Sequence, residues 1–215
     1  IRLPETTIIH EPSENTISFF DQRLRFPALA MFACMFAVIT AQIIIGFLIL
    51  DRIRDTSEQA AQLSGIVLTI TGITLGITQA FLAKMKNNVL LKSFMMGPIV
   101  ACAGLCIVSV AHSATLLITG YIFMAIGLGL LFPAVQAITA NSVDMNEQGA
   151  AAGTISAIQG LSSIVGPITA TILYQYNQSL PYWVAASLMA GLFLFVLMNQ
   201  SKFNSQFEHT DTEIA

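Results

Sequence analysis

The sequence predicts an all-α integral membrane protein with six transmembrane helices. Hydrophobic residues make up 55% of the 215 residues and charged residues only 10%, whereas soluble domains usually carry about 25% charged residues. The hydrophobic residues gather in six long segments, and none of their membrane-spanning stretches contains Asp, Glu, Lys or Arg. So little charge cannot cover a water-facing surface, and we therefore expect the segments to cross a lipid bilayer.

We expect a polar linker over residues 1–25, a six-helix bundle over residues 26–199 and a polar tail over residues 200–215. The first span, residues 26–50, would reach ~37 Å at a rise of ~1.5 Å per residue, which is enough to cross a ~30 Å hydrocarbon core. The other spans cover approximately residues 61–83, 93–111, 114–140, 149–174 and 181–198.

Short polar segments separate the spans. Charged residues 51–59 follow the first span, and basic residues 84–92 form a loop before the third. His112 and Ser113 leave room only for a very tight turn, and residues 141–148 form a polar loop. Pro181 opens the sixth span, because the first helical turn tolerates proline.

Lysine and arginine residues set the orientation. Six spans place both ends on one side, where seven of the nine basic residues fall, and only Arg52 and Arg54 lie on the other. Because basic residues gather on the cytoplasmic side, we expect both termini to be cytoplasmic, in a bacterial inner membrane. An aromatic belt then lies on the outer side, formed by Tyr174, Tyr176, Tyr182 and Trp183.

Small residues mark two surfaces where another helix could approach closely. The second span carries a GxxxG pair, Gly72 and Gly76. The fifth carries a longer ridge on one helical face, formed by Gly149, Gly153, Ala157 and Gly160. We expect both ridges to form tight helix interfaces.

Pro133 in the fourth span and Gly166–Pro167 in the fifth should bend their helices, because proline removes a helix hydrogen bond. The bends have two interpretations. They could shape a curved bundle, or they could form a hinge or gate.

Polar residues at membrane depth lie mainly on the first, second, fourth and fifth spans. A lipid-facing Gln without a partner would cost several kcal/mol, so Gln42 and Gln159 should face either a partner helix or a wet cavity. Hydroxyls can bond back to their own helix, and each Thr alone therefore means little. The third and sixth spans are poor in polar groups, which indicates that four helices line something polar and two support them.

Several kinds of chemistry have no residues to support them. The three histidines lie in loops or tails, and the three cysteines lie inside apolar runs without a metal-binding spacing. We therefore expect no metal, no cofactor and no enzyme activity. A net charge of −3 without a basic patch gives no basis for nucleic-acid binding. The chain does not begin with Met, and we expect it to be a fragment or a processed product.

Several motifs resemble one transporter family. Residues 2–6 read Arg-Leu-Pro-Glu-Thr, residues 120–134 combine Gly120, a Gly-rich run and Pro133, and Glu147-Gln148-Gly149 is followed by Gly153 and Gly166–Pro167. From Arg2 to Met198 the chain resembles the C-terminal half of a major facilitator superfamily transporter, most like the twelve-span drug:proton antiporters.

The resemblance implies two six-helix halves around a central cavity, with rocking-type alternating access. The six spans would be the family's seventh to twelfth, and the four polar ones would line the cavity. Residues 84–88 keep the positive charge of a family loop but lack its Asp and Gly. The family's antiporter motif and proton-titrating carboxylates lie outside this chain, so protons would pass through the other half.

The leading hypothesis is half of a proton-coupled exporter of small amphipathic molecules, drugs or metabolites such as siderophores. Its partners would be the bilayer, the N-terminal six-helix half and a small-molecule substrate. The alternatives are a self-standing six-span protein that dimerises as a scaffold or facilitator, and an uptake carrier for a polar neutral solute. The substrate-cavity candidates are Gln42, Thr71, Thr74, Tyr121 and Gln159, with Phe32 and Phe36 either stacking on substrate or packing between helices.

Overall fold

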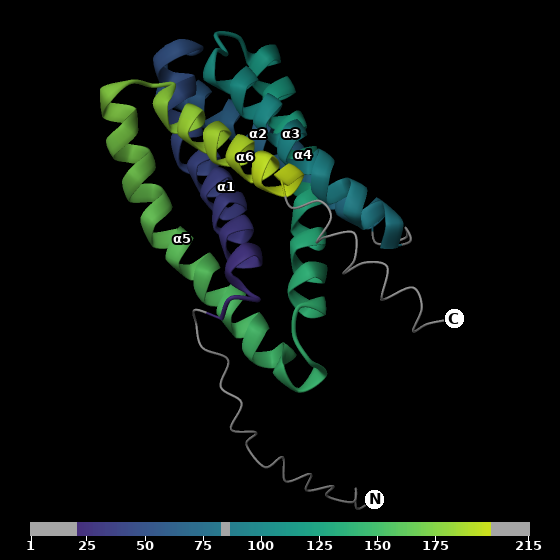
Figure 1. Cartoon of the computed structure of the whole chain (residues 1–215). Coiled ribbons are helices and arrows are strands. Elements are labelled where there is room, and N and C mark those ends of the chain that lie inside the picture. The colour runs from purple at the N-terminus through teal and green to yellow at the C-terminus, as the bar shows by residue number, and fades with distance from the viewer. Residues whose placement is uncertain (1–20, 83–86, 199–215) are drawn as a thin grey trace, which may run out of the picture.

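The computed structural model describes residues 21–82 and 87–198, with the side chains of residues 87–92 left aside. In this part the chain forms six α-helices and one short 3-10 helix (Figure 1). They are α1 (Arg25–Arg52), α2 (Ser57–Leu82), α3 (Asn87–Ser109), α4 (Ala114–Asn141), η1 (Met145–Glu147), α5 (Gln148–Tyr176) and α6 (Leu180–Met198). The Arg-Leu-Pro-Glu-Thr stretch, most of the predicted linker and the predicted tail lie outside the described residues.

The predicted all-α membrane fold is confirmed. Five of the helices are long and apolar enough to cross a membrane, and Ser93–Ser109 of α3 is apolar but shorter. α3 begins at Asn87, inside the segment predicted to be a basic loop. The predicted span and the helix begin at different residues for a physical reason. Apolar residues mark only the part of a helix that contacts lipid, whereas the helix itself extends as far as its backbone hydrogen bonds continue.

The four helices with polar residues at depth adjoin one another. α1 packs on α2, α4 and α5, and α2 also packs on α4. α3 and α6 contact each other and join the rest through α4 and α1. Figure 1 shows α5 along one edge of the bundle, beside α1. The apolar windows of α2 and α5 are only 11% and 22% buried, against 56% in α1 and α4, so α2 and α5 leave large surfaces uncovered.

Glycines bring α3 and α4 into backbone contact. A Cβ placed on Gly104 would lie 2.6 Å from the Gly120 carbonyl oxygen and would collide with the Met124 amide. One placed on Gly127 would lie 2.6 Å from the Gly97 carbonyl oxygen and would collide with the Ala101 backbone. Only glycine permits this approach, which is how membrane helices associate when lipid offers no hydrophobic driving force.

A buried tyrosine pair joins α4 to α1 and α6. The Tyr121 hydroxyl donates to the Ala41 carbonyl oxygen at 2.7 Å and lies 3.2 Å from the Tyr182 hydroxyl. Since Tyr121 has one hydroxyl proton, Tyr182 donates the second bond. Both side chains are fully buried. The pair therefore holds α1, α4 and α6 together through two buried hydrogen bonds.

Arg52 joins three chain segments at one end of the bundle, called here the Arg52 end. Its Nη1 donates to the Ser109 carbonyl oxygen at 2.9 Å, and its Nε and Nη2 donate to Gln178 Oε1 and Ser179 Oγ, each at 2.8 Å. Nearby, the Tyr174 hydroxyl donates to Asp51 Oδ2 at 2.6 Å. The end of α1, the α3–α4 turn and the α5–α6 turn are thus held together.

α4 and α5 run continuously through their prolines, with Pro133 and Pro167 inside the helices. Gly166 lies against α1, since a Cβ there would be 2.9 Å from Ile39 Cγ2. Gly166 therefore lets α5 approach α1, and a hinge at these positions stays a prediction.

Replacing Gly127 by Ala should destabilise the bundle, because the new methyl group has no room between two backbones. Overpacking of this kind costs about 1–3 kcal/mol. Gly191→Ala is the matched control, because Gly191 also lies within a helix but has open space around its Cβ position. Thermal unfolding in detergent should show a lower Tm for Gly127→Ala only. Equal Tm values for the two variants would contradict the proposed backbone contact.

Candidate functional site

Three of the predicted cavity residues surround one small cavity in the middle of the bundle, called here the midspan pocket. Gln42 of α1, Thr71 of α2 and Tyr121 of α4 line it, and its volume is about 150 Å³. The rest of the lining is apolar or glycine: Val38, Ala41, Leu68, Gly72, Leu75, Met124, Ala125 and Leu128. The sequence brings these side chains together because α1, α2 and α4 pack on one another.

The polar groups of the midspan pocket differ in what they can offer a ligand. The Tyr121 hydroxyl is committed to Ala41 and Tyr182, so Tyr121 presents its ring. Thr71 donates to the Val67 carbonyl oxygen at 2.7 Å, which leaves its oxygen as an acceptor only. The Gln42 side chain is exposed and makes no hydrogen bond within the described part of the chain. Gln42 therefore supplies the open polar group of this pocket.

Thr74 does not line the midspan pocket. Its hydroxyl donates to the Ile70 carbonyl oxygen at 2.7 Å, and Thr78 likewise bonds back to Thr74 at 2.8 Å. Thr78 also packs on α4, where a Cβ added to Gly129 would lie 2.8 Å from Thr78 Cβ. The threonine stripe thus satisfies itself within α2, and part of it serves helix packing.

A second, larger cavity opens between α4 and α5, near the bundle end opposite Arg52, and is called here the amide pocket. Its volume is about 350 Å³, and it contains the predicted residue Gln159. Two further amides, a threonine, a serine and small apolar residues complete the lining: Gln136, Thr139, Ala140, Gln148, Ala151, Ala152, Ile155 and Ser156. The Gln159 amide nitrogen lies 3.4 Å from Met31 Sδ, which is a weak acceptor.

Phe32 and Phe36 lie apart from both pockets. Phe36 is buried, and its ring stacks on Phe32 with centroids 6.2 Å apart. Phe32 lines an apolar groove between α1 and α6 together with Phe26 and Phe195, whose rings stack at 5.0 Å. Phe32 and Gln42 are ten residues apart, which rotates them ~80° around α1, so they meet different neighbours.

The predicted small-residue ridges are open in this structure. Gly72, Gly76, Gly149, Gly153 and Gly160 have nothing within 4 Å of a Cβ position among the described residues. The ridges lie on α2 and α5, the two helices with the largest uncovered surfaces. Within these six helices the ridges form no tight interface.

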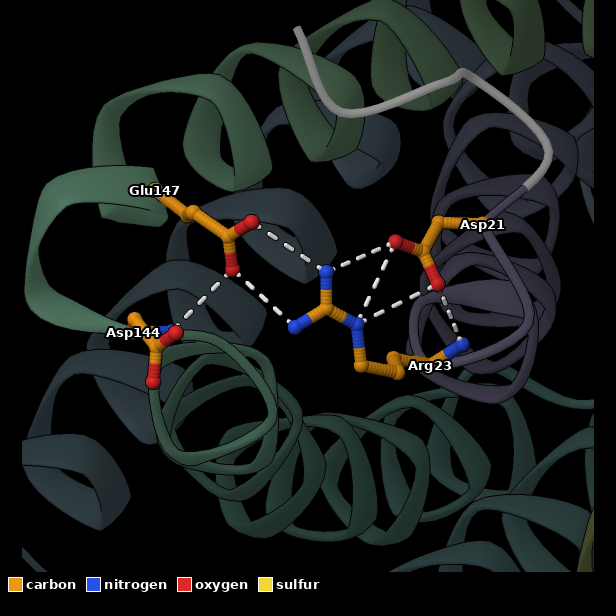
Figure 2. Close-up of polar contacts among 4 residues, drawn as sticks. All are labelled: Asp21, Arg23, Asp144 and Glu147. Carbon is orange, nitrogen blue, oxygen red and sulfur yellow. Dashed lines mark hydrogen bonds and ion pairs between the residues drawn. The ribbon is translucent and has the colours of Figure 1, made fainter. Parts of the chain in front are cut away.

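A charged cluster links the segment before α1 to the segment before α5. Figure 2 shows the Arg23 guanidinium between the carboxylates of Asp21 and Glu147. Arg23 Nη2 lies 2.9 Å from Asp21 Oδ2, and Nη1 lies 3.0 Å from Glu147 Oε2. The Glu147 carboxylate also accepts from the Asp144 amide at 3.3 Å, which completes a capping box on η1.

The hydrogen bonds from Arg23 lower the pKa of both the Asp21 and the Glu147 carboxyl below their ordinary values. The same two partners raise the pKa of the Arg23 guanidinium. The cluster is therefore fully charged at neutral pH. It lies outside the predicted spans, where water screens it, and its energetic contribution is that of a surface network.

The sequence profile of the Major Facilitator Superfamily matches residues 24–212, which covers all six described helices. The chain belongs to the major facilitator superfamily. It is therefore an integral membrane protein of a transporter family, as its composition and helices indicated.

Similar proteins include tetracycline resistance proteins and a proton-coupled antiporter flippase. Class G tetracycline resistance protein of Vibrio anguillarum is 32% identical over 112 residues, which cover 51% of this chain and 28% of the relative. Proton-coupled antiporter flippase LtaA of Staphylococcus epidermidis is 29% identical over 139 residues, covering 60% and 34%. Class C tetracycline resistance protein of Escherichia coli is 28% identical over 146 residues, covering 67% and 37%. The matched part of this chain spans about a third of each relative's length.

Sequence reasoning missed part of this superfamily member's polar structure. Gln148 and Ser156 follow the spacing 148, 152, 156, 159 on one face of α5, and that periodicity could have been found beside the glycine ridge. The Arg23–Glu147 pair joins residues 124 positions apart, and no local pattern indicates it.

Acidification should weaken the Arg23 cluster. Because the folded-state pKa values of Asp21 and Glu147 are lowered, the cluster stabilises the fold above the ordinary carboxyl pKa of about 4 and loses this effect as the pH falls through the lowered values. The Tm difference between the wild type and Glu147→Gln should thus be largest near pH 7 and shrink below about pH 4. Arg23→Gln should lower the Tm less in the Glu147→Gln background than in the wild type, because its partner carboxylate is already absent. A Tm difference that does not vary with pH would contradict the ion pair.

Proposed function

We propose that this chain is the C-terminal half of a secondary active transporter that exports small amphipathic molecules by alternating access, coupled to protons through the other half. The observation that carries the proposal is the midspan pocket, where Gln42 offers an open amide among apolar side chains. A pocket with one amide and no charge suits a substrate that is mostly apolar and carries a neutral polar group. The names of the relatives, tetracycline resistance proteins and a proton-coupled antiporter flippase, support export and proton coupling.

The division of charge supports coupling through the other half. None of the six predicted spans contains an acidic or basic side chain, and a proton carrier at membrane depth requires a titratable group. This half would then form a neutral wall of the cavity. In the proposed orientation both termini and the Arg23 cluster are cytoplasmic and the Arg52 end is outside, in a bacterial inner membrane.

The open ridges of α2 and α5 support a two-half arrangement. Glycines with nothing near them leave room for a helix to approach within backbone distance, as α3 and α4 do inside this half. We propose that the N-terminal half packs on the Gly72–Gly76 and Gly149–Gly153 ridges.

Replacing Gln42 by Leu should reduce export. Loss of one neutral hydrogen bond should lower the resistance that the complete transporter confers by about 3- to 10-fold. The measurement is the minimal inhibitory concentration of tetracycline and of a panel of amphipathic antibiotics at equal expression. Gln62→Leu is the control, because Gln62 is an exposed glutamine of α2 outside the midspan pocket. Unchanged resistance in both the Gln42→Leu and the Gln159→Leu variant would argue against a cavity role for these residues.

Photo-cross-linking should locate the other half on α2 and α5. Ile73, Ile168 and Leu194 are each 58% exposed, so they are equally accessible on α2, α5 and α6. A photoreactive residue at position 73 or 168 should cross-link to the N-terminal half in membranes, whereas one at position 194 should not. Cross-links between two copies of this chain would instead favour the self-standing dimer. Failure at both positions would argue against α2 and α5 as the helices that face the N-terminal half.

A further inference from the structure

The amide pocket combines three primary amides with no charged lining residue. Each amide offers two donors and an acceptor, so Gln136, Gln148 and Gln159 can bind groups that both donate and accept. The side chains of Gln136, Gln148 and Ser156 make no hydrogen bond within the described part of the chain. The pocket therefore presents unsatisfied hydrogen-bonding capacity without an electrostatic preference.

The depth of Gln159 is significant, because among the described residues its amide has only the weak Met31 sulfur as a partner. Gln136 lies ~7 Å along α4 from the end of the helix, and Gln159 lies ~16 Å along α5 from its start, which is about half of a ~30 Å hydrocarbon core. Polar groups at such depth must be satisfied by protein, water or ligand. A charged ligand would have no counter-charge among the lining residues, and its desolvation would be uncompensated.

The amide pocket is lined by α4 and α5, and its Gln159 reaches α1, whose Gln42 lines the midspan pocket. Gln159 contacts Met31, and Gln42 follows Met31 by eleven residues. Eleven residues rotate by ~20° beyond three full turns and advance ~16 Å, so Met31 and Gln42 share a face. A molecule with a polar head in the amide pocket could therefore extend its apolar part towards the midspan pocket.

We infer that the amide pocket is the head-group subsite of the transporter and takes an uncharged, hydroxyl-rich group, such as a sugar or polyol, attached to an apolar part. The inference rests on the proposed function and names its substrate class. In the proposed orientation the pocket opens at the cytoplasmic end, where an exporter loads its substrate.

Protection of a reporter cysteine tests the subsite. Ser156→Cys is introduced into the complete transporter with Cys34, Cys102 and Cys106 replaced by Ser, and membrane vesicles are labelled with a membrane-impermeant maleimide. Three competitors share an eight-carbon chain and are used below their micelle concentrations: octyl glucoside, octyltrimethylammonium and octanoate. We expect octyl glucoside to slow labelling at least threefold and the two charged competitors to leave it unchanged.

Two further reporters control the measurement. Asn141→Cys lies exposed at the end of α4 outside the pocket, and octyl glucoside should not alter its labelling. Gln148→Cys provides a second reporter in the pocket if Ser156→Cys does not fold. Gln136→Leu in the reporter background should raise the half-protecting concentration of octyl glucoside by about 3- to 10-fold. Gln62→Leu should not change it.

Three results would overturn the subsite: equal protection by all three competitors, no protection by octyl glucoside, or pocket reporters that remain unlabelled while Asn141→Cys reacts. The last would show that protein covers the pocket. Tetracycline transport is measured in the same vesicles. Transport without protection defeats the subsite alone, whereas protection without transport of any amphipathic compound defeats the proposed export function alone.

Discussion

The backbone contact between α3 and α4 is the constraint on which the rest of the bundle depends. Lipid gives apolar helices no reason to associate, so close approach and a few hydrogen bonds must hold the fold together. The same turn of α4 serves both purposes, because Gly120 meets α3 while the adjacent Tyr121 reaches α1 and α6. α4 is thereby fixed beside α1 and α2, and the midspan pocket forms where the three helices meet.

The sequence predicted the helices, but the glycines that make the tight contact within these six helices were not among those it singled out. GxxxG drew attention to Gly72 and Gly76, which stand open in the structure. The observed contact uses Gly97 with Gly104 and Gly120 with Gly127. Seven residues rotate only ~20° away from two full turns, so each pair lies on one face just as a GxxxG pair does. The spacing was visible, whereas the identity of the partner helix was not.

The polar candidates show a similar limit. Their positions inside the apolar spans placed Gln42, Thr71 and Tyr121 at membrane depth, and the structure groups them in one pocket. The sequence could not show that the Tyr121 hydroxyl donates a hydrogen bond to the Ala41 carbonyl oxygen, because the two residues are 80 positions apart. Nor could the sequence show that Gln159 lines a different pocket from Gln42, because this depends on the distance between α5 and α4.

The contacts that hold α5 and the contacts that hold α4 are differently placed along the bundle. α1 and α5 are joined by Tyr174 and Asp51 at the Arg52 end, by Gly166 and Ile39 in between, and by Arg23 and Glu147 at the opposite end. They should move as one unit.

α4 is held differently. Tyr121 lies in its first part, and from there it bonds α4 to α1 and α6. Towards Asn141 a short segment that contains η1 joins α4 to α5, and the amide pocket lies between the two helices there. At that end the amide pocket is lined by Gln136 and Gln148, whose side chains make no hydrogen bond within the described part of the chain, and by Gln159, whose amide has the weak Met31 sulfur as its partner. Gln148 of this pocket directly follows Glu147, so the pocket lies on the side of the Arg23 cluster, and its own lining residues carry no charge.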